Sequence, residues 1–130
     1  MLSKRQLMAL SDFRFELARF LRFSEHASRT VGITPLQYLL LLHIRGFRGR
    51  DSASVGELAL RLQASPHGTA ALVERCATSG LVRKRRAAGD RRRVDVHLSP
   101  RGHVLVERIA RRHRAELRQL RAVFRVTHVG

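Results

Sequence analysis

The residues best suited to do chemistry in this chain are arginines gathered in one short segment. Residues 81–98 read LVRKRRAAGDRRRVDVHL, with a basic run on each side of Ala-Ala-Gly-Asp. A guanidinium pairs with a phosphate through two parallel hydrogen bonds, and it also fits the edge of a guanine base. The segment therefore favours contact with a polyanion. The alternative, a charged turn that only faces solvent, fits less well because so many cations fall on one segment.

This arginine-rich segment is predicted to be a β-hairpin. Residues 94–98 alternate between aliphatic and polar side chains, which is the pattern of a half-exposed strand, and residues 81–86 form the strand before it. Gly89-Asp90 supplies the turn between them. The alternation puts Arg93 and Asp95 on the side opposite the valines, so Arg93 is also compatible with a purely solvent-facing role.

Two short helices are predicted directly before the hairpin. Ser54-Val-Gly-Glu57 is a capping box that begins a helix ending near residue 62. Ser65-Pro66 begins a second helix, residues 65–79, which Gly80 ends. The short connection forces the two helices to cross steeply, as in a helix-turn-helix. In that arrangement helix 65–79 is expected in the major groove of duplex DNA and the hairpin, residues 83–93, at the neighbouring minor groove.

The start of helix 65–79 supplies the residues expected to face DNA. The predicted outward positions are His67, Gly68, Thr69, Ala71 and Arg75. Gly68 and Ala71 have no side chain that donates a hydrogen bond to a base edge, so direct readout would depend on the other three. The two cap serines, Ser54 and Ser65, stabilise helix starts by about 1 kcal/mol each, and free N–H groups at such starts also bind phosphate.

Composition supports a polyanionic partner and limits the other classes. The chain has 130 residues, enough for one domain, and its 26 basic and 10 acidic residues give a net charge of +16. Its single cysteine excludes an intrachain disulfide, which fits a reducing cytosol and a cytoplasmic location. The most apolar run, residues 36–44, is too short to span a membrane, so no membrane partner is expected.

The sequence predicts neither an enzyme nor a cofactor. It contains no nucleophile elbow, no phosphate-cradling glycine loop and no matched pair of carboxylates. Glu25, His26, His43 and His113 could in principle hold a metal, but their spacing shows no tight ligand pair, so no metal site is expected. Cys76 lies on the apolar side of helix 65–79 and is expected to be buried and inert.

Longer amphipathic helices are predicted on both sides of this unit, at residues 3–29 and 99–124, and a further helix at residues 35–44. The two flanking helices are longer and more apolar than a small monomeric domain needs, so we expect them to pair between two chains. The residues proposed for that contact are Leu7, Leu10, Leu117, Leu120 and Phe124.

Four segments together resemble the MarR family of bacterial winged helix-turn-helix regulators: ITPLQYLLLLHI, SVGELALRL, SPHGTAALVERCATSGLV and GDRRRVDVHLSPRG. The resemblance covers residues 33–105 and implies a mainly α fold with a small β-hairpin wing. It implies one MarR-like domain over residues 1–130, with dimerisation helices at 1–30 and 100–128. Such a homodimer reads two half-sites of a pseudo-palindrome about 34–36 Å apart.

The resemblance also assigns roles to individual arginines. Asp90 and Arg92 hold the family's Asp-x-Arg positions, in which the aspartate orients an arginine that enters the minor groove. Arg85, Arg91 and Arg93 are further candidates for DNA contact. Arg75 matches an arginine that often supports the fold or contacts phosphate, which is an equal alternative to base readout.

Family members mostly repress transcription, and many leave DNA when a small aromatic acid or phenol binds between the dimerisation and DNA-binding regions. Phe20, Tyr38, His43 and Phe47 are the candidate lining of such a site, although aromatic residues of this kind are more often simply core. Two alternatives remain. One is a basic architectural nucleic-acid-binding protein of low specificity without an effector. The other is an RNA-binding wing domain, which a monomeric state would favour.

Overall fold

The computed structural model describes residues 1–126, with the side chains of all but Arg91 and residues 122–126. Over this range the chain forms six helices and three strands. In chain order these are α1 (Lys4–Thr30), α2 (Pro35–Arg45), β1 (Ser52–Ser54), α3 (Val55–Leu62), α4 (Pro66–Thr78), β2 (Val82–Ala87), β3 (Asp90–Leu98), α5 (Pro100–Arg112) and α6 (Arg114–Val126). The predicted fold class, mainly helical with a hairpin wing, is confirmed.

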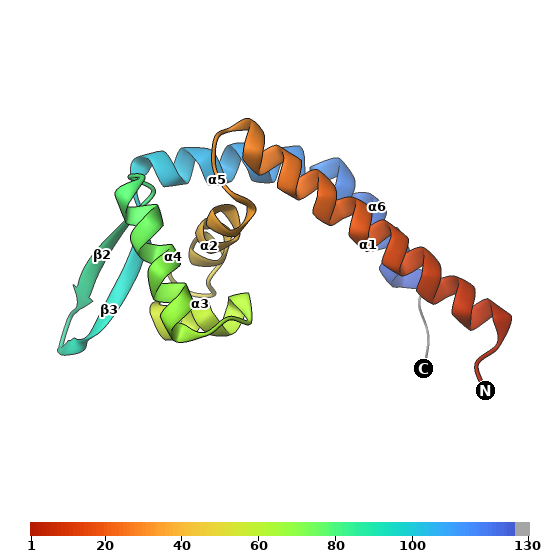
Figure 1. Cartoon of the computed structure of the whole chain (residues 1–130), viewed down its shortest axis with the longest axis horizontal. Helices are drawn as coiled ribbons and strands as arrows, with labels where there is room; N and C mark the ends of the chain where they lie inside the picture. The colour runs from red at the N-terminus through yellow and green to blue at the C-terminus, as the bar shows by residue number, and fades with distance from the viewer. Residues whose placement is uncertain (127–130) are drawn as a thin grey trace.

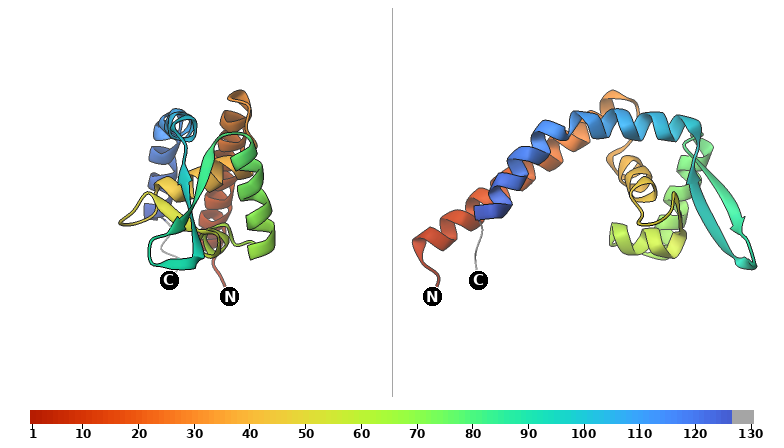
Figure 2. Two further views of the ribbon diagram at one scale, coloured as in Figure 1. Left: turned by 90° about the vertical axis from the view of Figure 1, so that its left-hand side faces the viewer. Right: turned by 180° about the vertical axis from the view of Figure 1, so that it is seen from behind.

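The molecule consists of a small unit at the end of a long arm (Figure 1). The unit contains α2, α3, α4 and the β2–β3 hairpin, and the arm is formed by α1 lying along α5 and α6 (Figures 1 and 2). Across the arm, Arg19 of α1 donates to Gln119 of α6 at 2.6 Å and pairs with Glu116 at 3.4 Å. None of the helices described is both long and apolar enough to cross a membrane.

Helices begin where serine or threonine supplies a cap. Thr34 Oγ1 accepts a hydrogen bond from the backbone N–H of Gln37 at 3.1 Å, and Gln37 Oε1 accepts from the N–H of Thr34 at 2.9 Å. Ser65 and Ser99 cap α4 and α5 through one bond each, from the N–H of Gly68 and of Gly102, and each is followed by proline at the first helical position. These caps satisfy N–H groups that the first helical turn leaves without partners.

The core lies between α2 and the elements around it. Leu40, Leu41 and Ile44 of α2 are fully buried, because this helix is covered on several sides by neighbouring elements. Other fully or nearly fully buried side chains come from each remaining part of the unit and from α5: Leu58, Val73, Cys76, Leu81, Val96 and Ile109. The predicted burial of Cys76 is confirmed, and desolvation raises the pKa of its thiol to about 11.

The hairpin belongs to a three-stranded antiparallel sheet with the order β1-β3-β2. Ala53 of β1 and Lys84 of β2 both stand opposite Val96 of β3. The sequence prediction missed β1, since three residues of sequence Ser-Ala-Ser are too few to show a period of two. This strand ties the start of α3 to the hairpin.

The prediction of one continuous last helix over residues 99–124 is wrong in one respect. The helix is broken at His113 into α5 and α6. The His113 Nδ1 atom lies 2.6 Å from the carbonyl oxygen of Ile109, and its ring packs against Phe20, Phe23 and Tyr38 at centroid distances of 5.3–5.6 Å. These contacts hold the side chain inside the joint between arm and unit, which periodicity alone does not reveal.

Candidate nucleic-acid interface

The outward face of α4 is built from small and polar side chains. His67, Gly68, Ala71 and Arg75 are exposed, as predicted. Thr69 is 1% exposed, and its hydroxyl donates to the carbonyl oxygen of Ser65 at 2.8 Å. The prediction that Thr69 faces outward is therefore wrong: the helical period places it with the buried residues Leu72, Val73 and Cys76.

The two cap serines lie where the sequence placed them. Ser65 Oγ accepts from the N–H of Gly68 at 3.0 Å, and Ser54 Oγ accepts from the N–H of Glu57 at 3.2 Å. Each hydroxyl keeps its own proton, so it can still donate to a phosphate oxygen. A Cβ added at Gly68 would lie 3.1 Å from Ser65 Oγ, which makes this turn tight for any larger residue.

The tip of the wing carries three arginines in a bulge. Arg86 stands opposite Val94 but Ala87 stands opposite Asp90, so β3 advances four residues while β2 advances one. Residues 91–93 fill this extra length. Asp90 Oδ1 accepts from the backbone N–H of Arg92 at 2.9 Å, which fixes the course of the chain at the turn.

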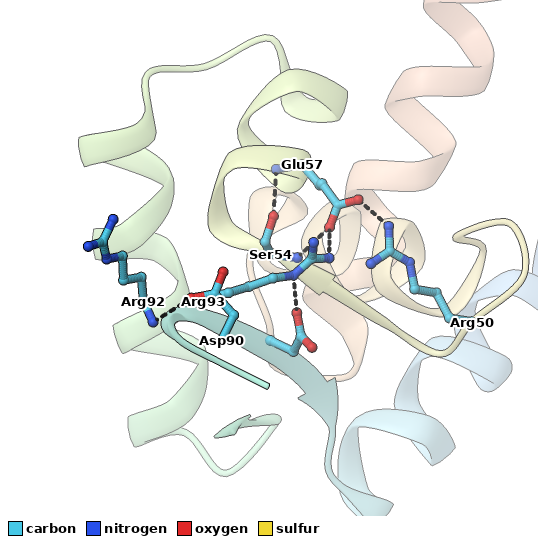
Figure 3. Close-up of polar contacts among 7 residues, drawn as sticks. Arg50, Ser54, Glu57, Asp90, Arg92 and Arg93 are labelled. Atoms are coloured by element: carbon cyan, nitrogen blue, oxygen red, sulfur yellow. Dashed lines mark hydrogen bonds and ion pairs between the residues drawn. The ribbon is translucent and has the colours of Figure 1, made fainter. Parts of the chain in front are cut away.

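The guanidinium of Arg92 points away from the rest of the wing (Figure 3). Its side chain is exposed, and no described carboxylate forms an ion pair with it. Asp90 thus orients Arg92 through its backbone rather than its guanidinium. The arrangement leaves a free cation at the tip of the hairpin.

Arg93 differs from its neighbour because it faces inward to two carboxylates. Its Nε donates to Asp95 Oδ1 at 3.0 Å, and one of its terminal nitrogens donates to Glu57 Oε1 at 2.9 Å (Figure 3). The sequence suggested either DNA contact or solvent for Arg93, and the structure adds an intramolecular ion pair. Glu57 was interpreted from the sequence only as part of a capping box.

Glu57 joins three parts of the unit. Oε1 also accepts from the backbone N–H of Ser54 at 2.9 Å, and Oε2 forms an ion pair with Arg50, whose guanidinium carbon lies 4.4 Å from the centre of the Phe47 ring. Desolvation by burial raises the pKa of the Glu57 carboxyl. The hydrogen bonds from Ser54 and the pairing with Arg50 outweigh it, so this pKa lies below its ordinary value.

The β2 strand adds exposed cations beside α4. Arg83, Arg85 and Arg86 are exposed, whereas Lys84 forms an ion pair with Glu74 of α4. This pair neutralises one charge on each element and ties the hairpin to α4. Arg85 stands opposite Asp95 in the strand pairing.

The residues predicted to form the dimer contact lie along the arm. Leu7, Leu10 and Leu117 are large apolar side chains that remain exposed in the single chain. Leu120 is half-buried, and the side chain of Phe124 lies outside the described residues.

The four residues predicted to line a ligand site do not share one centre. Phe20 and Tyr38 both pack on His113. Phe47 lines a hollow of about 370 Å³, together with Arg48, Glu57, Leu60 and Arg61. His43 is half-buried, and burial together with the charge of Arg61 lowers its pKa.

A larger hollow, of about 410 Å³, lies between α2 and the α5–α6 helices, and the sequence analysis did not identify it. Its lining residues are Leu42, Arg45, Val106, Glu107, Ala110, Arg111 and Arg114. The described part of the chain brings together no group of three His, Cys, Asp or Glu side chains that could hold a metal ion.

Two steeply crossing helices followed by a basic hairpin define a winged helix-turn-helix protein. Residues 31–93 match the model of the MarR family. With this fold, residues 31–93 form a winged helix-turn-helix of the MarR family of DNA-binding transcriptional regulators, a family without enzymatic activity. No curated protein sequence matches the chain.

Solved structures share the fold at low sequence identity. A MarR family protein from Bacillus stearothermophilus is 22% identical, with a TM-score of 0.75, over 99% of this chain and 86% of that one. AbsC, a MarR family transcriptional regulator from Streptomyces coelicolor, is 21% identical, with a TM-score of 0.74, over 92% and 80%. A mutant MarR from E. coli complexed with operator DNA is 21% identical, with a TM-score of 0.68, over 82% and 74%.

Proposed function

We propose that this chain acts in the cytoplasm as a homodimeric repressor that binds a pseudo-palindromic operator. In this proposal α4 enters the major groove and the wing reaches the adjacent minor groove. The observation that carries it is the free guanidinium of Arg92 at the wing tip. That tip and the N-terminus of α4 lie at the same end of the winged unit (Figure 1).

The distribution of charge supports this orientation. The β2 strand, which carries exposed arginines, packs beside α4, and the N-termini of α3 and α4 offer backbone N–H groups and serine hydroxyls. Helix N-termini and arginines are both suited to phosphate oxygens. A related fold, the mutant MarR from E. coli, was solved with operator DNA, which makes the same mode of binding reasonable here.

The test is a selection from random duplex DNA with the purified protein at near-physiological salt, followed by sequencing. We expect enrichment of an inverted repeat whose half-sites are about one helical turn apart, from centre to centre. A single unpaired half-site would contradict the dimeric mode. Absence of any DNA binding would remove the proposal altogether.

A second function, low-specificity architectural binding of nucleic acid, is favoured by one observation. Gly68 and Ala71 occupy exposed positions on α4 where a base-reading helix needs hydrogen-bonding side chains. Tight, salt-dependent binding without enrichment in the selection would support this function over the first. An RNA-binding role would require a preference for RNA over duplex DNA and a monomer in solution.

We also propose that a small aromatic acid weakens the DNA complex. The hollow between α2 and the α5–α6 helices separates the winged unit from the arm, and Arg45, Arg111 and Arg114 line it. Arg45 is paired with Asp51 and Arg111 with Glu107, whereas no described carboxylate forms an ion pair with Arg114, so a ligand carboxylate would pair with the guanidinium of Arg114. Titration of the protein–DNA complex with salicylate should release DNA from the wild type and less from Arg114→Gln; equal release from both would place the effector elsewhere.

A further inference from the structure

We infer that Glu57 is the positioning residue of the wing. It withdraws Arg93 and Arg50 from the cations available to DNA and fastens the base of the bulge to α3, so that Arg92 is left to meet the groove. The inference rests on the proposed DNA-binding function and adds to it a residue that does not itself touch DNA.

The contacts of Glu57 form a closed ring. Glu57 Oε1 holds both the N–H of Ser54 and the guanidinium of Arg93, and Arg93 in turn holds Asp95. Asp95 stands opposite Ser54 in the pairing of β3 with β1. Because the ring closes through side chains on one side and the strand pairing on the other, the hairpin cannot pivot on α3 without breaking one of these contacts.

The surroundings make these ion pairs stronger than ordinary surface pairs. The side chains of Glu57 and Asp95 are 27% and 19% exposed, and that of Arg93 is 39% exposed. Partial removal from water reduces screening, although the exposed part of Arg93 keeps the gain modest. The guanidinium of Arg93 is held at two nitrogens, so it has less orientational freedom than a guanidinium held by a single contact.

The ring also changes where the positive charge of the wing lies. Two cations, Arg50 and Arg93, meet two carboxylates, Glu57 and Asp95, so the cluster has no net charge. Among the wing side chains that the structure describes, the uncompensated charge is therefore at Arg92 and along the outer side of β2. Recognition of a narrow minor groove by Arg92 gains from this, because each further free cation beside it would bind any phosphate and reduce discrimination.

Glu57→Gln isolates the charge from the helix cap. Glutamine still accepts from the N–H of Ser54 in a capping box, but it does not form ion pairs with Arg50 and Arg93. On random-sequence DNA we expect the slope of log K against log salt to steepen by about 1 to 2, because each released arginine adds one phosphate contact. The ratio of specific to non-specific affinity should fall by about fivefold or more.

Asp51→Asn is the matched control. It adds the same unit of charge and frees one arginine, Arg45, but it leaves the ring around Glu57 intact. We expect Asp51→Asn to change the salt slope by less than half as much and to leave the affinity ratio unchanged. Equal effects of the two variants would show that only net charge matters and would overturn the inference.

A double-mutant cycle tests whether Arg93 is really withheld from DNA. Arg93→Gln alone should leave the slope of log K against log salt nearly unchanged. In the Glu57→Gln background it should make this slope shallower by about 1. If Arg93→Gln alone lowers the slope as much as Arg92→Gln does, Arg93 already contacts DNA in the wild type and the inference is wrong.

Amide hydrogen exchange of the free protein separates this inference from the proposed function. Both Glu57→Gln and Arg93→Gln should speed exchange at residues 86–95 by about tenfold, while Asp51→Asn should not. If the wild type binds no DNA, the proposed function fails, yet faster exchange would still show the tether. Unchanged exchange in both variants would remove the tether even if DNA binding is strong.

Discussion

Arg92 and Arg93 are adjacent in the chain, yet their guanidinium groups lie in different surroundings. Arg93 meets Glu57 and Asp95, whereas Arg92 turns outward from the bulge with its backbone held by Asp90. Adjacent side chains of a strand point to opposite faces, so Arg93 shares a face with Asp95 while Arg92 does not. The carboxylates therefore hold Arg93 within the protein, whereas the guanidinium of Arg92 stays free.

Replacing Arg92 by glutamine should weaken operator binding by about tenfold or more, since a charged hydrogen bond to DNA is worth about 1.5–3 kcal/mol. Thermal unfolding and sedimentation should be unchanged, because the side chain has no described ion-pair partner. The control is Arg108→Gln, which removes the same charge. Arg108 is an exposed residue of α5, far along the chain from the wing. Equal loss of affinity in both variants would mean that the wing has no special role.

The thiol of Cys76 should be unreactive in the native protein. Burial raises its pKa to about 11, so at pH 8 roughly one thiol in a thousand is ionised. Iodoacetamide should label it only after unfolding, and labelling of the native protein should remain slow until the pH approaches 11. Rapid labelling at pH 8 would indicate an opening of the core and would revive a redox role for this cysteine.

The sequence predicted single residues well where the signal is local. The caps Ser54 and Ser65, the burial of Cys76 and the exposure of His67 depend on neighbours within one or two helical turns. Thr69 was placed on the wrong side because its hydroxyl suggested base contact, although its position in the helical period matches the buried residues. The pairing of Glu57 with Arg93 spans 36 residues, so no local pattern contains it.

At the scale of elements, the end of α4 is locked to the start of α5. The N–H of Ser99 donates to the carbonyl oxygen of Leu81 at 3.0 Å, and the N–H of Gly102 donates to Ser99 Oγ at 3.0 Å. Arg101 adds a bond to the carbonyl oxygen of Ser79 at 2.5 Å. The helix proposed to enter DNA is therefore joined directly to the arm.

This junction requires glycine at position 102. A Cβ there would overlap the carbonyl oxygen of Leu81, which is backbone and cannot turn aside. Gly102→Ala should lower the free energy of unfolding by about 1–3 kcal/mol, as overpacking usually does. Gly56→Ala is the matched control: its Cβ meets nothing within 4 Å, so it should raise stability by about 0.5–1 kcal/mol.

Urea unfolding of both variants measures these changes. The opposite signs matter more than the sizes, because both substitutions add one methyl group to a helical glycine. If Gly102→Ala is as stable as the wild type, the close contact between α5 and Leu81 is not maintained in solution.

The starts of the helices with a serine or threonine cap were predicted well, because the cap stands directly before an apolar period. The helix predicted at residues 3–29 is α1 within one residue at each end, and the two short helices were found. Both hairpin strands were also found, although β3 begins at Asp90 and not at residue 94. The two misses have a common cause: β1 and the break at His113 both depend on contacts between distant segments. β1 exists by pairing with β3, and His113 is held by rings of α1 and α2.

At the scale of the whole molecule, the arm is an unusual feature for a chain that would be alone in solution. Large apolar side chains along α1 and α6 stay in contact with water, among them Leu7, Leu10 and Leu117. Their burial against a second copy of the chain would offset the repulsion between two strongly basic molecules, since the hydrophobic gain is about 25 cal/mol for each Å² removed from water. The dimer itself remains a proposal.

Leu117→Glu should convert the dimer to a monomer. Leu117 is 50% exposed, so the single chain tolerates a charge there, but a dimer interface would have to bury that charge without a partner. Leu60→Glu is the matched control, because Leu60 is 80% exposed on α3, outside the arm. In sedimentation at micromolar concentration we expect a monomer for Leu117→Glu and a dimer for the control and the wild type.

On a full operator the Leu117→Glu monomer should bind each half-site independently, with a loss of affinity that grows as protein concentration falls. If Leu117→Glu still sediments as a dimer, α6 does not form the interface, and the two winged units must be joined through another surface.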